Sequence, residues 1–175
     1  MRRSFLILML ASTPVMAQQP QSRDAVGPAV GAARAHWRAV HLNIQRAAEQ
    51  LPESLYNFKP TPQVRSFAEL FGHVAGSEFM FCAPVRGDTP KAEDAVESTT
   101  KDKAGLVKAL KDAAAYCEVA YSISDAESAR MIDVFGQRSK LNTLVFNAIH
   151  DGEHYGNLVT YLRLKGLVPP SSQRQ

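Results

Sequence analysis

Neither sign of charge dominates this sequence, and no cluster of basic residues stands out along it. Lys and Arg together number 20, and Asp and Glu together number 17. Proteins that bind nucleic acid usually present a basic patch or stripe, often with aromatic residues between the charges. Because the sequence has neither feature, we expect no nucleic-acid partner.

Long apolar runs are absent after the N-terminal segment, so we expect no membrane span. The N-terminal segment itself is typical of a secretory signal peptide. Its basic part is Arg2 and Arg3, its apolar part runs from residue 5 to residue 11, and small residues before Ala17 form a cleavage site. We therefore expect cleavage after Ala17 and a periplasmic or secreted protein.

The two arginines also resemble a twin-arginine export signal, a route for proteins that fold and load metal before export. Adjacent arginines occur in ordinary signal peptides as well, so both export routes stay open. Residues 18–175 suffice for one domain with its own core and are too few for two.

Cysteine is scarce, and catalytic motifs that work without a metal are missing. Cys82 and Cys117 are the only cysteines, and neither has the flanking signature of a catalytic thiol. No glycine-rich phosphate loop and no serine in a nucleophile elbow is present. In an oxidising compartment the two cysteines could form one disulfide. The alternative is a pair of small buried side chains.

Apolar residues recur at steps of three and four along most of the chain, which is the period of helices with one buried face. Capping residues and helix breakers divide this pattern into four helices. We expect them over Asp24–Leu51, from Ser66 to Pro84, from Thr99 or Thr100 to Tyr121, and from Ser139 to Leu164. Strand alternation and hairpin signals are absent. The predicted fold class is therefore all-α, a four-helix bundle.

Two segments connect the later helices. Val85–Thr100 contains glycine, proline and many charges and is predicted to be a loop. Between Ser124 and Gly136, a Ser124–Glu127 pair could cap a short helix that the glycine ends.

The loop of residues 85–100 is long enough to cross the bundle, which would make helices two and three parallel. A crossover would bring Cys82 and Cys117 to the same level, whereas a simple up-down bundle would place them at opposite ends. We predict a long crossover loop between helices two and three. The sequence does not decide whether Cys82 and Cys117 form a disulfide.

Three histidines lie on the second and fourth predicted helices. His150 and His154 are four residues apart, which places both imidazoles on one face of a helix, where one divalent ion can bind both. His73, on helix two, would supply a third ligand. Three protein ligands leave a coordination position open, which is typical of catalytic rather than structural sites.

The histidine pair belongs to a polar stripe on the fourth helix. Unpaired imidazole and amide groups inside a core are costly, so such a stripe needs partners, and a metal ion with hydrogen-bonded ligands would satisfy it. Two surface histidines spaced this way by chance are the alternative. The stripe consists of Asn147, His150, His154, Asn157 and Tyr161.

Other ionisable residues nearby are expected to lie outside the metal site. Asp151 and Glu153 point away from the histidine face, so solvent-exposed or inter-helix positions are expected, with a hydrogen bond to a ligand or general-base catalysis as the alternative. Glu78 lies about 140° round helix two from its histidine. His36 and His41 are five residues apart, so they form no same-face pair; surface positions are expected, with one of the two turned inward as the alternative.

Two stretches carry a family resemblance, LPESLYNFKPTPQVRSFAELFGHVAG and HDGEHYGNLVTYLRLKGLVPPS. They resemble the DinB-like, damage-inducible-type four-helix metalloproteins, over essentially the whole chain after the signal peptide. By that resemblance His73, His150 and His154 match the family's metal triad. It implies a divalent metal such as zinc or nickel, and the thiol-dependent transferase or isomerase activity of several members. Those members are cytosolic, so the expected export signal is a departure.

Together these features predict an exported, divalent-metal-binding protein that is a metal-dependent hydrolase or transferase acting on a small molecule. Zinc or nickel is the expected metal, with iron, manganese or copper as alternatives, because imidazole suits several ions. The competing hypothesis is a non-catalytic metal- or ligand-binding module. The sequence is also compatible with a homodimer.

Overall fold

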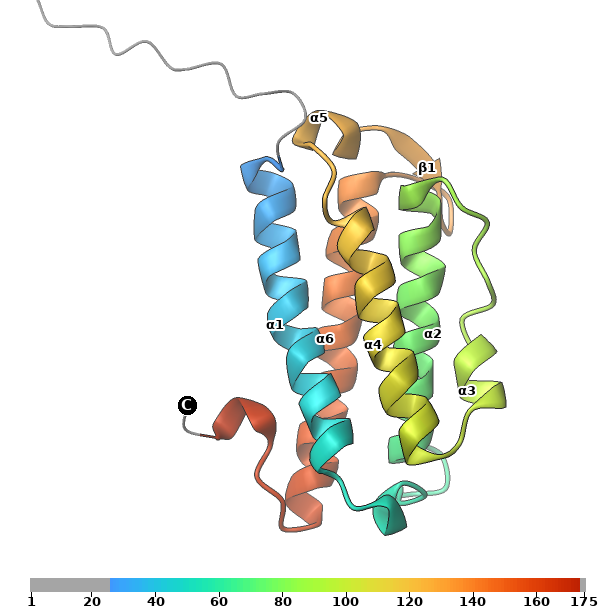
Figure 1. Ribbon diagram of the computed structural model, residues 1–175, viewed down its shortest axis with the longest axis vertical. Coiled ribbons are helices and arrows are strands. Elements are labelled where there is room, and N and C mark those ends of the chain that lie inside the picture. The colour runs from blue at the N-terminus through green and yellow to red at the C-terminus, as the bar shows by residue number, and fades with distance from the viewer. Residues whose placement is uncertain (1–25, 174–175) are drawn as a thin grey trace, which may run out of the picture.

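Four long helices pack side by side in the computed structural model, which describes residues 26–173 (Figure 1). The predicted signal peptide lies outside the described residues. The helices of the bundle are α1 (Pro28–Gln50), α2 (Phe67–Arg86), α4 (Lys103–Ala120) and α6 (Lys140–Leu164). None of the helices within residues 26–173 is long and apolar enough to cross a membrane.

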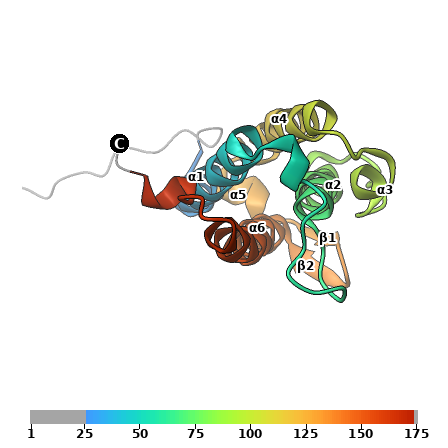
Figure 2. The same ribbon diagram turned by 90° about the horizontal axis from the view of Figure 1, so that it is seen from below.

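Two of the four long helices run in one direction along the bundle, and the other two run in the opposite direction. Figure 1 shows α1 and α6 running downward, whereas α2 and α4 both run upward. Viewed along the bundle, α2 lies beside α4 and α6, and α1 lies beside both as well (Figure 2). Two consecutive parallel helices require a connection that returns along the bundle. The predicted four-helix bundle with a crossover between its second and third helices is therefore confirmed.

The crossover contains a helix that the sequence analysis missed. Within the predicted loop, α3 (Ala95–Thr99) forms one helical turn on the outer side of α2 (Figures 1 and 2). The next helix begins at Lys103 rather than after the predicted threonines, because the Asp102 side chain accepts a hydrogen bond from the Gly105 amide.

The first and second helices differ from prediction at their ends. α1 begins at Pro28, because Gly27 forms its N-cap and proline suits the first helical position. α2 has the predicted capping box between Ser66 and Glu69. The helix continues through Pro84, which lies in its last turn and removes only a single helical hydrogen bond. It ends at Arg86, and Gly87, with a φ of 88°, forms the C-cap.

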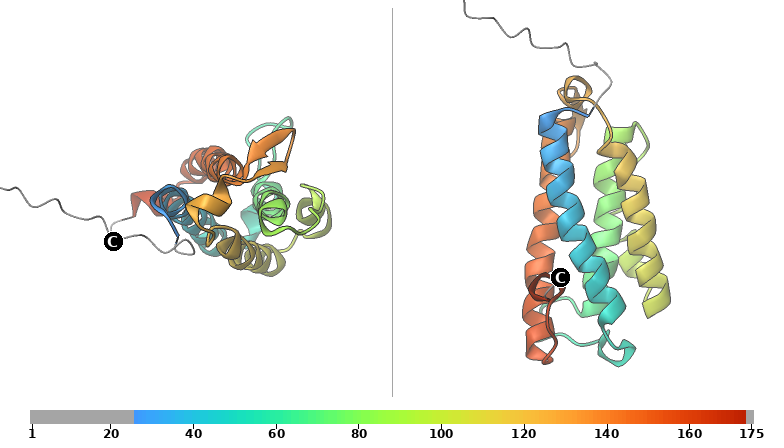
Figure 3. Two further views of the ribbon diagram at one scale, coloured as in Figure 1. Left: turned by 90° about the horizontal axis from the view of Figure 1, so that it is seen from above. Right: turned by 60° about the vertical axis from the view of Figure 1, so that its left-hand side comes forward.

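A small hairpin also went unpredicted. β1 (Met131–Asp133) and β2 (Gln137–Ser139) pair antiparallel and lie beside α2 and α6, to the side of the bundle when it is viewed from above (Figure 3). Three-residue strands are too short to show an alternating pattern, so the sequence could not reveal them. The suggested short helix before the hairpin is present as α5 (Asp125–Ser128), capped by Ser124. Short 3-10 helices occur at Glu53–Leu55 and Pro170–Ser172.

The core consists of two hydrophobic clusters, one toward each end of the bundle. The cluster at the end where α1 and α6 finish includes Phe67, Phe71 and Leu110. The cluster at the opposite end includes Trp37 and Tyr121, whose stacked rings have centroids 4.5 Å apart. Buried polar side chains from α1, α2 and α6 lie between the two clusters.

The two cysteines confirm the parallel arrangement of α2 and α4. Cys82 and Cys117 are joined by a disulfide with a Cα–Cα distance of 5.3 Å. Both side chains are fully buried in the second cluster. The disulfide therefore connects the C-terminal halves of the two helices that the crossover makes parallel.

Candidate metal centre

The three predicted histidines meet between α2 and α6. His73 comes from α2, and His150 and His154 come from successive turns of α6. The Nε2 atom of His150 lies 3.2 Å from that of His73 and 3.1 Å from that of His154. The side chains of His73 and His150 are 5% and 13% exposed, so three ring nitrogens converge where little water can reach them.

These distances fit a shared metal ion. Zinc binds histidine nitrogen at about 2.0–2.1 Å, so two nitrogens at corners of a tetrahedron lie about 3.3 Å apart. The observed separations of 3.1 and 3.2 Å are close to that value. Three imidazoles that turn their lone pairs toward one another would repel without a proton or cation between them. The arrangement is therefore suited to a divalent cation.

The surroundings keep these rings neutral. Burial, aided by the nearby charge of Arg65, lowers the pKa of His73 to about 3. Burial likewise lowers the pKa of His150 to about 4 and lowers the pKa of His154. A neutral imidazole has one nitrogen lone pair available as a ligand, so near neutral pH no proton has to be displaced.

A hydroxyl group fixes which nitrogen of His150 faces the triad. Ser77 donates its hydroxyl hydrogen to the Val74 carbonyl oxygen at 3.0 Å. Its Oγ lies 3.4 Å from Nδ1 of His150 and is left to accept a hydrogen bond from that nitrogen. With hydrogen on Nδ1, the Nε2 lone pair points into the triad. Such partners commonly orient metal-binding histidines.

Two carboxylates from the crossover also reach the triad, and sequence reasoning missed both. Oε2 of Glu97 lies 3.4 Å from Nδ1 of His73, and Arg65 holds this carboxylate through its Nε at 3.0 Å. Oε1 of Glu93 lies 3.6 Å from Nε2 of His150 and 3.8 Å from Nε2 of His73. The segment was predicted as a loop, and nothing in its sequence indicates that it folds back over helix two.

A second group of polar residues lies deeper in the bundle and corrects the expectation for His41. His41, expected on the surface, is 4% exposed, and its Nδ1 lies 2.7 Å from Oε1 of Glu78. The same oxygen accepts a hydrogen bond from Trp37. Asp151 is fully buried beside Glu78, in an inter-helix position. As expected, Glu78 lies outside the triad. The clue in the sequence was a charged residue within an almost wholly apolar helix, which requires a buried partner.

Two protons, one on His41 and one on Asp151, can balance the charge of this second group. Burial would lower the pKa of His41, but the Glu78 carboxylate outweighs burial and raises it. Burial and the same carboxylate raise the pKa of Asp151 well above its usual value. A protonated Asp151 beside a His41–Glu78 ion pair leaves no net charge. The ligand atoms of His41, Glu78 and Asp151 lie within 4.8 Å of one another, so this group could also hold a metal ion.

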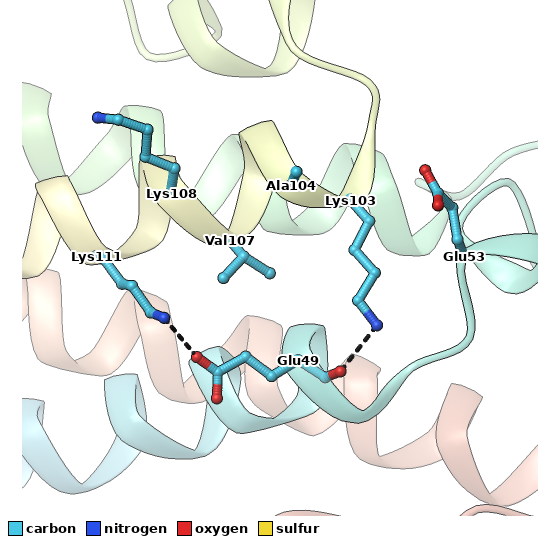
Figure 4. Close-up of a pocket in the computed structure, with 7 residues that line it drawn as sticks. All are labelled: Glu49, Glu53, Lys103, Ala104, Val107, Lys108 and Lys111. Atoms are coloured by element: carbon cyan, nitrogen blue, oxygen red, sulfur yellow. Dashed lines mark hydrogen bonds and ion pairs between the residues drawn. The ribbon is translucent and has the colours of Figure 1, made fainter.

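A cavity of about 530 Å³ opens beside the triad. His154 lines it together with polar residues that include Lys59, Arg65, Glu153 and Asn157. Asn157 and Glu153 are exposed, so the predicted polar stripe continues from the buried triad to solvent. Another cavity, of about 600 Å³, lies between the end of α1 and the start of α4 and includes none of the triad (Figure 4). Of these two cavities, only the first is lined by a histidine of the triad, His154.

Comparison with known proteins places this helical bundle in a family. A model described as the DinB superfamily matches residues 19–158, which is most of the chain. The chain belongs to the DinB superfamily. The resemblance expected from the sequence is therefore confirmed.

Solved DinB-like structures share the fold at low sequence identity. A DinB-like protein from Bacillus cereus matches with a TM-score of 0.70 and 13% identity, over 85% of this chain and 98% of that one. One from Bacillus subtilis matches with a TM-score of 0.55 and 21% identity, over 82% and 99% of the two chains.

A mycothiol-dependent maleylpyruvate isomerase is a third structural neighbour. It matches with a TM-score of 0.61 and 16% identity, over 74% of this chain. This chain spans only 59% of the isomerase's length. No functionally curated protein matches. At these identities, the likeness to the three solved structures shows the bundle fold alone.

Proposed function

We propose that this chain binds one divalent metal ion through His73, His150 and His154 and is a metal-dependent hydrolase or transferase acting on a small molecule. The observation that carries the proposal is the convergence of three neutral Nε2 atoms, with separations of 3.1 and 3.2 Å. A divalent ion there, zinc or nickel first, would supply Lewis-acid chemistry, by lowering the pKa of a bound water or thiol or polarising a carbonyl group.

The surrounding side chains would position ligands and substrate. Ser77 directs the Nε2 lone pair of His150 into the triad, and Glu97 attracts the Nδ1 hydrogen of His73. The cavity beside His154 has both basic and acidic residues, which suits a small polar substrate. The isomerase among the structural neighbours is described as mycothiol-dependent, which supports transfer or isomerisation with a thiol cosubstrate as one reaction class.

Export to an oxidising compartment is part of the same proposal. The N-terminal sequence has the charge and hydropathy pattern of a signal peptide. The Cys82–Cys117 disulfide supports this, since stable disulfides are rare in reducing compartments. The reaction would then use a thiol or other substrate available outside the cytosol.

A non-catalytic metal-binding module is the second candidate. Low exposure of the triad favours it, because His73 is 4% and His154 is 8% exposed. A metal site that serves sequestration or stability has a closed coordination shell, whereas the metal of a catalytic site must accept an exchangeable ligand.

Ligand exchange separates these two functions. We would load the full chain with Co²⁺, whose visible absorption reports its ligands, and titrate it with azide and with a small monothiol. For an enzyme we expect a saturable spectral change, because an added ligand must reach the metal. A His36→Ala protein should behave like the wild type, since His36 is exposed and outside the triad. A spectrum that neither additive changes would support the closed module instead.

A further inference from the structure

The crossover lies directly on α2 at the level of the triad. Gly72 and Gly76 are one helical turn apart and flank His73. A Cβ atom at Gly72 would overlap the backbone of Glu97, and one at Gly76 would overlap the carbonyl oxygen of Glu93. Only glycine allows this approach of backbone to backbone. The two glycines thus place Glu93 and Glu97 over the histidines.

The carboxylate of Glu93 faces the Nε2 atoms of His73 and His150, which also face each other. Its Oε1 lies 3.6 Å from Nε2 of His150 and 3.8 Å from Nε2 of His73. Within residues 26–173, no lysine or arginine lies within 4.0 Å of this carboxylate. A cation held by the triad would explain why an otherwise unpaired carboxylate points there.

We propose that Glu93 is a fourth protein ligand of the metal site. This inference rests on the proposed function, since it requires a metal bound by the three histidines. Carboxylate oxygen is an ordinary zinc ligand alongside histidine. The distances of 3.6 and 3.8 Å exceed the tetrahedral spacing of about 3.3 Å by only a few tenths of an ångström, which a small side-chain rotation covers.

The position of Glu93 makes it the exchangeable ligand of the four. The histidines belong to long helices of the bundle, whereas Glu93 precedes the five-residue helix α3, and its side chain is 39% exposed. A substrate oxygen or sulfur entering from the cavity beside His154 would take its place. The Glu93 carboxylate, once displaced, would be free to accept a proton from a water or thiol in the cavity. The crossover would close the site at rest and open it for substrate.

Co²⁺ binding to variants of the full chain tests this. We would compare Glu93→Gln and Glu93→Ala with the wild type, and use Asp94→Asn as the matched control. Asp94 is the adjacent carboxylate on the same segment, is exposed and makes no capping hydrogen bond. The readouts are the visible spectrum of bound Co²⁺ and the Kd from competition with a chelator.

For both Glu93 variants we expect an altered spectrum and a Kd at least about tenfold weaker, with Asp94→Asn unchanged. If the Glu93 variants bind one equivalent with the spectrum and Kd of the wild type, Glu93 is not a ligand, and the triad proposal survives. If the wild type takes up no Co²⁺, both proposals fail. Far-UV circular dichroism would verify that every variant folds.

Discussion

The three histidines of the triad differ in what lies near their second ring nitrogens. Nδ1 of His150 lies 3.4 Å from the Ser77 hydroxyl, and Nδ1 of His73 lies 3.4 Å from the Glu97 carboxylate. Nδ1 of His73 and Nδ1 of His154 are both buried with no hydrogen-bond partner among the described residues. Only the His150 ring is therefore oriented by a hydrogen-bonding side chain. A carboxylate that accepted the Nδ1 hydrogen of His73 would strengthen that ring as a ligand.

The low pKa of His73 predicts a pH-dependent stability in the metal-free protein. The folded-state pKa of His73 is about 3, whereas a histidine in an unfolded chain has a pKa near 6.5. Below pH 6.5 the unfolded chain therefore binds the proton more readily, and stability falls as the pH falls toward 3. From pH 7 to pH 5, His73 alone should cost about 2 kcal/mol.

Urea unfolding of the metal-free wild type and of His73→Ala at both pH values measures this contribution. The variant should lose about 2 kcal/mol less than the wild type over that interval. Titrating groups outside the triad, such as His41, are present in both proteins, so their effects cancel in the difference. His36→Ala, which changes an exposed histidine, should follow the wild type. Equal losses in the wild type and His73→Ala would contradict the buried, neutral state of His73.

Residue spacing revealed the triad but could not reveal the residues around it. The four-residue separation of His150 and His154 is a local property of one helix, and both residues do lie on the single helix α6. His41 was expected on the surface because its spacing from His36 gives no same-face pair. Its partner Glu78 is 37 residues away, and the two side chains meet only when the four helices assemble around the core. A contact of this kind depends on helix rotation, which spacing within one helix does not determine.

At the scale of elements, the crossover is what distinguishes this bundle from a simple up-down arrangement. It makes α2 and α4 parallel, carries Glu93 and Glu97 to the triad, and brings the two cysteines together. The length of the connection and the positions of the cysteines predicted the parallel pair. The contact of α3 with Gly72 and Gly76 was not predictable, since glycine within a helix has several explanations.

The disulfide should contribute substantially to stability. It closes a chain segment with a sequence separation of 35 residues. Closing a loop of this length restricts the unfolded chain by about 4 kcal/mol on the chain-entropy model. A Cys82→Ala/Cys117→Ala protein should therefore unfold at a clearly lower urea concentration than the oxidised wild type.

Reductant provides the control for this comparison. It should lower the stability of the wild type toward that of the double variant and leave the double variant unchanged. Counting free thiols in the denatured, non-reduced wild type should give none. Two free thiols per chain, with a stability insensitive to reductant, would show that the cysteines are only packed together.

At the scale of the whole molecule, a polar layer separates two hydrophobic clusters. The layer includes His41, Glu78 and Asp151, and the histidine triad adjoins it. Each cluster has aromatic and aliphatic side chains from all four long helices, so the bundle does not depend on the polar layer for its core. Helical periodicity predicted this architecture well, because four amphipathic helices have few other ways to bury their apolar faces.

The account depends above all on a metal ion bound jointly by α2 and α6. The most direct test is the metal content, by elemental analysis, of the wild type, His73→Ala and His36→Ala proteins after equal exposure to Zn²⁺ and gel filtration. We predict about one ion per chain in the wild type and in His36→Ala, and a severe loss in His73→Ala, because the variant removes one of the three histidine ligands. Full occupancy in His73→Ala would contradict the triad.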